Sequence, residues 1–219
     1  MSAEIISDSI PSSSNTAAAT SSTENERHIL IVSIVTCFVL SLPHILYYFI
    51  WMKPYLWMRS ATKANLDPVQ RIYHLAVVIK VVQYTAAIFW WFSVLEPHQL
   101  QIALDQISPW SETPYTFWQG LGIPMFLIGQ FLNVAAYGAI GVDGIYYGYK
   151  LGKKIPWCYD WPFGGPWALK NPQYIGCSIS IWGAFFFLCS TPHYEAGAMN
   201  ISIFWSLCYL FSGIVENFF

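Results

Sequence analysis

The chain has 219 residues, of which 55% are hydrophobic and 10% are charged, with a net charge of −2 and a mean hydropathy of +0.43. Soluble domains carry about 25% charged residues, so this composition excludes an ordinary soluble globule and predicts an integral membrane protein. The aromatic share of 18% is typical of Trp and Tyr belts at membrane interfaces. The charge balance also excludes a nucleic-acid partner, because the chain offers no concentrated basic surface.

Residues 1–28 differ in composition from the rest of the chain. They are small, polar and slightly acidic, and they lack the basic region and cleavage site of a secretory signal. Such a segment buries too little apolar surface to fold, so the sequence predicts a disordered tail. Residues 29–219 are predicted to form one integral membrane domain.

Apolar runs recur along that domain. Ile29–Trp51, Ile72–Leu95 and Trp118–Val142 are each long enough for a helix to cross the roughly 30 Å hydrocarbon core. Tyr174–Ser190 and Met199–Val215 are shorter, and form either two tight crossings or one crossing with a re-entrant segment. No strand-like alternation spans a barrel's length. The predicted fold class is all-α: a polytopic transmembrane helical bundle with four or five membrane segments.

The loops between these runs differ in charge, and basic loops stay on the cytosolic side. The first loop carries Lys53, Arg59, Lys63 and Arg71, and the third carries Lys150, Lys153, Lys154 and Lys170. The second loop has acids but no Lys or Arg. Loops one and three are therefore predicted to be cytosolic. Five crossings would return Glu216 to that side, beside the third loop, and four would not.

The segment NPQYIG opens the fourth apolar run. Asn171 is a good N-cap and Pro172 suits the first helical position, so a helix is predicted to begin here. The free N–H groups of its first turn attract anions such as a carboxylate or phosphate. Tyr174 can add a hydroxyl, and Gly176 can leave room for a flat ring. The alternative is that the segment only caps and anchors a membrane helix.

Other polar or small residues stand at or inside membrane runs. Glu216 either marks the interface or binds a cation or a ribose diol, and Asn217 can supplement it. Gly120-Leu121-Gly122 opens the third run without the strand–helix context of a dinucleotide site. Lys80 lies inside the second run, where a charge is costly, and is predicted to snorkel to the cytosolic interface. The five cysteines are scattered without metal-site spacing, so no metal is predicted.

Several motifs together resemble a known family. They are GQFLN (129–133), GxxGxYYG (141–148), KxIPW (153–157), WPFG (161–164), NPQYIG and the closing acid at Glu216. Their order and spacing over residues 35–217 resemble the small phospholipid N-methyltransferases, of the phosphatidyl-N-methylethanolamine N-methyltransferase type. None of these motifs is specific alone.

The resemblance implies a reaction and a location. S-adenosyl-L-methionine would donate methyl groups to the amine of phosphatidyl-N-methylethanolamine and its dimethyl form, ending in phosphatidylcholine. The sequence leaves open whether phosphatidylethanolamine is also a substrate. The chain would be a multi-pass protein of the endoplasmic reticulum membrane, or also of mitochondrial membranes. Its partner is then a membrane phospholipid, no metal is needed, and the sequence does not define the oligomeric state.

The resemblance also implies cofactor contacts. The family's GxG element corresponds to Gly120, Leu121 and Gly122, and its pair of acids corresponds to Glu216 and Asn217, where one charge is lost. The helix at Asn171 can take the cofactor's carboxylate, with Tyr174 and Gly176 beside it, while Glu216 takes its amino group. The predicted topology nevertheless separates the GxG element from the other residues. Aromatic residues suit the cationic products, and the cage candidates are Trp157, Trp161, Tyr146 and Tyr147.

Two points stay open at the level of sequence. The lipid amine must lose a proton before attack, and no residue pattern identifies the catalytic base. The alternatives to this reaction are a sterol or steroid reductase that uses NADPH, an isoprenylcysteine carboxyl methyltransferase, and a membrane scaffold or small transporter. The reductase reading is weakened because Asn171 and Cys177 stand where its motif has a basic residue and an acid.

Overall fold

A computed structural model describes residues 13–107, 116–156 and 158–218, and every regular element in these ranges is a helix. The predicted all-α fold class is therefore confirmed. The helices are α1 (Ser13–Met52), α2 (Pro54–Lys63), α3 (Pro68–Ser93), α4 (Pro97–Ile107), α5 (Phe117–Ile145), α6 (Pro172–Leu188), α7 (Thr191–Glu195) and α8 (Ala198–Phe218).

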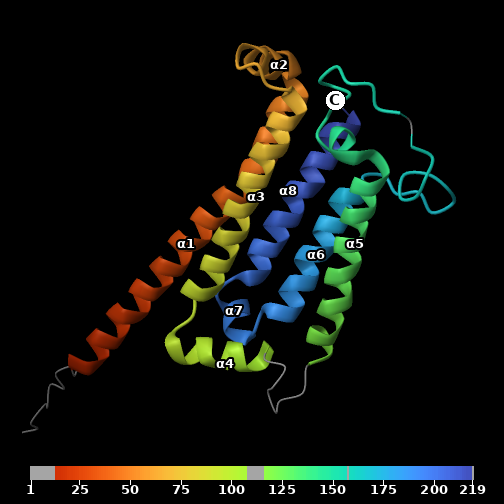
Figure 1. Cartoon of the computed structure of the whole chain (residues 1–219). Coiled ribbons are helices and arrows are strands. Elements are labelled where there is room, and N and C mark those ends of the chain that lie inside the picture. The colour runs from red at the N-terminus through yellow and green to blue at the C-terminus, as the bar shows by residue number, and fades with distance from the viewer. Residues whose placement is uncertain (1–12, 108–115, 157, 219) are drawn as a thin grey trace, which may run out of the picture.

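The long helices run up and down between two ends of a bundle (Figure 1). In that view α1 rises to α2 at the upper end, α3 descends, and α4 lies across the lower end. The chain then rises along α5, crosses the upper end in the third loop, and descends along α6. The short α7 turns it at the lower end, and α8 returns to the upper end beside the start of α6.

Four described helices are long and apolar enough to cross a membrane. They contain Thr23–Met52, Pro68–Ser93, Phe117–Ile145 and Ala198–Phe218. Their outward side chains are large and apolar, as expected where lipid replaces water as the solvent. The helix α6 is shorter, at 17 residues, but it runs through the bundle in the same way and packs along α5. The chain is thus a multi-pass helical bundle.

The first helix starts earlier than the composition predicts. The structure places α1 from Ser13, inside the segment 1–28 that was predicted to be a disordered tail. Helix-forming alanines precede the membrane run, so the helix propagates backwards from the span at a small cost per residue. Residues 1–12 lie outside the described part of the chain, and the domain boundary at residue 28 stays a prediction.

Local capping sets where the central helices begin. The Asp67 carboxylate accepts hydrogen bonds from the backbone N–H groups of Val69 and Gln70, both at 2.9 Å, and so caps α3. The N–H of Gln70 and the neighbouring Lys153 hold the pKa of Asp67 below its usual range. At α5, Thr116 and Gln119 form a reciprocal capping box. Both helices therefore start at defined residues.

Glycines let α5 and α6 pack closely against each other. A Cβ on Gly122 would stand 2.7 Å from the carbonyl oxygen of Gly183, and one on Gly176 would stand 2.7 Å from that of Gly129. Small residues allow helices to approach closely in a membrane, and at these two positions the distances leave room for glycine alone. This contact along their length fixes the position of α6, and with it the NPQYIG segment at its start.

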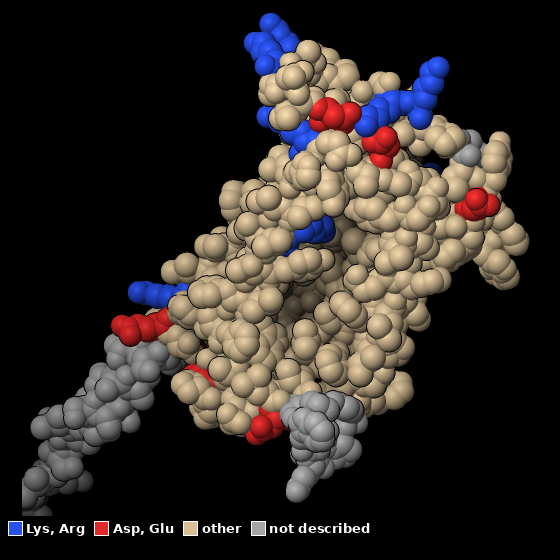
Figure 2. Space-filling view, in the orientation of Figure 1, with Lys and Arg blue, Asp and Glu red and all other residues tan. Residues whose placement is uncertain are grey.

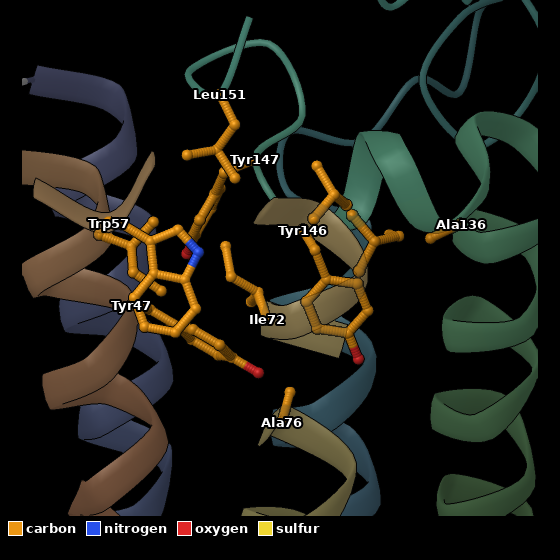
Figure 3. Packing of buried hydrophobic residues seen from close by; sticks show 11 residues of the cluster. Tyr47, Trp57, Ile72, Ala76, Ala136, Tyr146, Tyr147 and Leu151 are labelled. Carbon is orange, nitrogen blue, oxygen red and sulfur yellow. The ribbon is translucent and has the colours of Figure 1, made fainter. Parts of the chain in front are cut away.

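A cluster of buried side chains lies at the upper end of the bundle (Figure 3). It joins α1, α2, α3, α5 and the third loop, and includes Tyr47, Trp57, Ile72, Ala76, Ala136, Tyr146, Tyr147 and Leu151. Aromatic rings dominate the part nearest α1. This packing holds the third loop against the helices, although the loop is rich in glycine.

The basic residues of the first and third loops gather at the same upper end (Figure 2). Lys153 of the third loop bridges Asp67 before α3, at 3.0 Å, and Asp143 in α5, at 2.8 Å. The hydrogen bond to Asp143 raises the pKa of Lys153, with a further contribution from Asp67. The prediction that loops one and three share a face is therefore confirmed.

Candidate active site

Three segments bring polar groups together at the upper end. Tyr174, in the first turn of α6, donates a hydrogen bond to the Glu216 carboxylate near the end of α8. Tyr147, just after α5, places its hydroxyl oxygen 3.2 Å from that of Tyr174. Tyr147 also interacts with the Glu216 carboxylate. The result is a chain of two neighbouring hydroxyls that face one carboxylate.

The backbone at Tyr147 is unusual. Its φ of 61° lies in the left-handed region, which non-glycine residues rarely adopt. The kink at Gly141, whose φ is 63°, breaks the regular path of α5 shortly before it. Together they turn the Tyr147 ring back between α1 and α8. Burial raises the pKa of Tyr147, so its hydroxyl stays protonated and acts as a donor.

A tight aromatic crevice, which in this structure leaves no room for a water molecule, lies beside Glu216. It is lined by α1, α8 and Tyr147, through His44, Tyr47, Tyr48, Trp51, Tyr147, Phe211, Ser212, Val215 and Glu216. The ring of Tyr147 meets those of Tyr47 and Trp51 edge to face, at centroid distances of 5.8 and 5.3 Å. The ammonium of Lys150 lies 4.1 Å from the Trp51 ring, so one face of this wall already holds a cation. Aromatic walls next to a carboxylate suit a positively charged guest.

The floor of the crevice contains a buried histidine. The Nδ1 atom of His44 lies 2.8 Å from the Ser212 hydroxyl, and its ring stands edge-on to Tyr209 at 4.6 Å. The Nε2 atom of His44 is buried and has no hydrogen-bond partner among the described residues. A buried polar atom without a hydrogen-bond partner costs folding free energy, so the Nε2 atom of His44 stands out among the polar atoms of the crevice.

Most of the residues predicted at the start of α6 and the end of α8 come together. Asn171 occupies the N-cap position with Pro172 behind it, which confirms the predicted helix start. Asn171 has a left-handed φ of 58° and makes no side-chain capping bond, so its amide lies against Gly213 of α8 instead. The Asn217 amide donates to the Gly213 carbonyl at 2.6 Å. Asn171, Tyr174, Glu216 and Asn217 therefore share one end of the bundle.

The glycines predicted as cofactor contacts lie elsewhere. Gly120 and Gly122 begin α5 at the lower end of the bundle, and a Cβ on Gly122 would clash with the end of α6 near Gly183 (Figure 1). Tyr174 and Phe187 are 13 positions apart on α6, which separates the two ends by roughly 20 Å at 1.5 Å per residue. Gly120, Leu121 and Gly122 do not share a pocket with Glu216. Gly176 also packs against α5, so it opens no room for a ring.

The aromatic cage differs from the one predicted. Trp161 stacks on Phe131 at 5.6 Å on the outside of α5, and Tyr146 bonds the Tyr137 hydroxyl at 2.7 Å within the buried cluster. Trp157 lies outside the described residues. Of the predicted set, Tyr147 alone among the described residues lines the crevice. The other walls come from α8 and from α1, where the sequence run YYFIW shortly after His44 was the available signal.

Lys80 does not snorkel to the interface as predicted. Its ammonium donates to the Tyr209 hydroxyl of α8 and lies 5.0 Å from that ring's centre, so it points into the bundle. The hydrogen bond to Tyr209 on the neighbouring α8 is thus preferred to an extended side chain that reaches the lipid headgroups. Lys80 thereby stands next to a large groove between α3 and α5, with a volume of about 770 Å³.

Fold and site define a multi-pass helical membrane protein with a carboxylate, a hydroxyl chain and an aromatic crevice at its basic end. The chain is 28% identical, over 176 residues, to a phosphatidyl-N-methylethanolamine N-methyltransferase of Arabidopsis thaliana; the match covers 80% of this chain and 87% of the relative. This similarity confirms the resemblance to the phospholipid N-methyltransferase family. It supports a methyltransferase, and therefore an enzyme, and does not favour the reductase alternative.

No protein-family model and no solved structure matches the chain. Within the described residues, no group of three or more His, Cys, Asp and Glu side chains lies close enough to hold a metal ion.

Proposed function

We propose that this chain transfers methyl groups from S-adenosyl-L-methionine to the amine of phosphatidyl-N-methylethanolamine and of its dimethyl form, yielding phosphatidylcholine. We place the activity in the endoplasmic reticulum membrane or a mitochondrial membrane. The observation that carries the proposal is the Glu216 carboxylate, bound by Tyr174 at the start of α6 and facing an aromatic crevice. The similarity to a methyltransferase whose name specifies that lipid supports it.

The residues at the upper end fit the two charged ends of a methionine-derived cofactor. Glu216 offers a carboxylate for its amino group. Asn171 makes no side-chain cap on α6, Pro172 has no N–H, and the N–H of Tyr174 already bonds the Asn171 carbonyl at 3.0 Å, so the N–H of Gln173 is the donor of this first turn that suits the cofactor's carboxylate. Asn171 itself brings an amide to the same place. When bound, S-adenosyl-L-methionine supplies an electrophilic methyl group on a sulfonium.

The same residues can position a lipid amine and its product. Tyr174 holds Glu216 through the hydrogen bond that it donates, which orients the carboxylate. Tyr47, Trp51 and Tyr147 present aromatic rings that attract an ammonium, and more so one that carries methyl groups and fewer N–H donors. Methyl transfer is an in-line displacement, so holding donor and acceptor in line lowers much of the barrier.

The test is radiolabelled methyl transfer by the purified protein in lipid micelles. Labelled S-adenosyl-L-methionine is supplied with phosphatidylethanolamine, its monomethyl form or its dimethyl form in separate reactions. We expect label in the lipid fraction with the monomethyl and dimethyl forms, and the phosphatidylethanolamine tube defines whether the first step also belongs here. Absence of label with all three lipids refutes the proposal, and binding of NADPH in that case would favour a reductase.

A further inference from the structure

A groove runs along the bundle between α3 and α5, with α6 and α8 as its floor. It encloses about 770 Å³. Figure 2 shows the surface hollowed at this place, between the two helices. Its rims include large side chains that are well exposed, such as Tyr84 (53%), Ile88 (58%) and Phe92 (46%). Because these rims belong to membrane-crossing helices, the groove opens toward the lipid.

The groove changes character along its length. Toward the lower end its walls are apolar, and Leu104 and Ile107 of α4 contribute to them where that helix lies across the lower end. Toward the middle it is lined by groups that hydrogen-bond, which are Tyr84, Gln130, Asn133, Cys177, Ser180 and Tyr209. Gln130 donates to the Ser180 hydroxyl at 2.9 Å, which holds the polar part in place. An apolar trough with one polar end matches an amphiphile.

Lys80 provides a charge at the polar end. Its ammonium contacts Tyr209, which lines the groove, and no described carboxylate forms an ion pair with it. A lysine ammonium has three donors, and the Tyr209 hydroxyl accepts one of them. An intramembrane ammonium without an acidic partner is costly, so an anion that came with the ligand would be favoured there.

The polar end of the groove lies next to the candidate active site at Tyr174 and Glu216. The Tyr209 ring, which Lys80 contacts, lies 6.1 Å from the Tyr174 ring, and Tyr174 binds Glu216. Lys80 stands seven residues after Tyr73, roughly 10 Å along α3 from this aromatic residue near the basic end. Lys80 lies at the middle of α3 and points inward to Tyr209, so a phosphate bound there sits well below its usual depth, inside the groove rather than among the headgroups.

From this arrangement we propose that the groove is the binding site for the acceptor phospholipid, with an acyl chain in the apolar trough and the phosphate on Lys80. The proposal rests on the proposed function for the identity of the headgroup. Its amine, two carbons beyond the phosphate ester, then extends past Tyr209 toward Tyr174 and Glu216. Charge complementarity selects a phospholipid over a neutral lipid, because the Lys80 ammonium otherwise has no counter-charge among the described residues that line the groove.

Photo-cross-linking tests the site without requiring turnover. The purified protein, in detergent micelles, is exposed to phosphatidyl-N-methylethanolamine that carries a diazirine in one acyl chain, or to a diacylglycerol with the same diazirine. We expect the phospholipid to label residues of α3, α5 and α6 that line the groove. Lys80→Met should reduce that labelling about tenfold, because a hydrogen bond to a charged group is lost. It should leave diacylglycerol labelling unchanged, and Lys63→Met, on exposed α2, should change neither.

A second pair of variants tests the trough itself. Ala87 lines the groove, whereas Thr85 is exposed on α3 and does not. Ala87→Phe should therefore block labelling by both lipids, and Thr85→Phe should not. Equal labelling of Ala87→Phe and wild type, or equal loss of both lipids in Lys80→Met, would overturn the proposal. Cross-linking proceeds without S-adenosyl-L-methionine, so a failure of methyl transfer is read separately from a failure of this site.

Discussion

Replacing Glu216 by Gln tests the cofactor site with little change of shape. The amide oxygen can still accept from the Tyr174 hydroxyl, but the negative charge is lost. A hydrogen bond to a charged group contributes about 1.5–3 kcal/mol, and about 1.4 kcal/mol corresponds to tenfold in affinity. Because Glu216 is partly buried between helices, solvent screens it less than a surface carboxylate. We therefore expect affinity for S-adenosyl-L-methionine to fall about tenfold to a hundredfold.

The assay is the dissociation constant for S-adenosyl-L-methionine by equilibrium dialysis, together with its KM in the methyl-transfer reaction. Glu195→Gln is the matched control, because Glu195 ends α7 at the lower end of the bundle. The melting temperature of both variants should remain near that of the wild type, which separates lost binding from lost folding. An unchanged dissociation constant in Glu216→Gln would refute the assignment of this carboxylate to the cofactor.

Other substitutions probe the remaining assignments. Asn217→Glu restores the family's pair of acids and should keep or improve affinity for S-adenosyl-L-methionine; an inactive variant would count against that correspondence. Gly122→Ala should destabilise the bundle by about 1–3 kcal/mol in denaturant titration, because its Cβ meets the α6 backbone. Gly120→Ala meets nothing within 4 Å, so stability should hold, and an altered cofactor affinity would restore the GxG assignment that the resemblance implies. Asp67→Asn keeps an N-cap for α3 but removes the carboxylate, whose pKa is lowered in the folded protein. The wild type should lose thermal stability as the pH falls through that pKa, and the variant should not show this loss. Identical melting temperatures of the two proteins across the acid range would contradict this.

Local and compositional signals were sufficient for the membrane architecture. Long apolar runs predict helices because lipid leaves no other way to satisfy the backbone, and this requirement needs no knowledge of neighbours. The start of α6 at Pro172 was likewise predictable, since Pro172 acts on its own turn, although Asn171 does not form the predicted side-chain cap. The basic residues of the first and third loops also indicated correctly that both loops lie at the same end of the bundle, because the Lys and Arg residues next to a span determine which side its end faces.

The site depended on contacts between residues that are distant in the chain. Tyr174 and Glu216 are 42 positions apart and His44 and Ser212 are 168 apart, and no local pattern specifies either pair. The direction of Lys80 depended on Tyr209 of another helix, so the prediction made from its own helix was wrong. The topology predicted from the sequence had already separated Gly120 and Gly122 from Glu216, and the antiparallel packing of α5 on α6 agrees with it.

The sequence by itself thus determined the long apolar helices, their order and the charged end of the bundle, because hydrophobicity and capping act over a few residues. Only the tertiary structure decided which polar groups meet, because helix packing in a membrane is set by the shapes of whole faces, here the glycine contacts between α5 and α6. Those contacts bring the start of α6 to Glu216 and leave the groove beside Lys80.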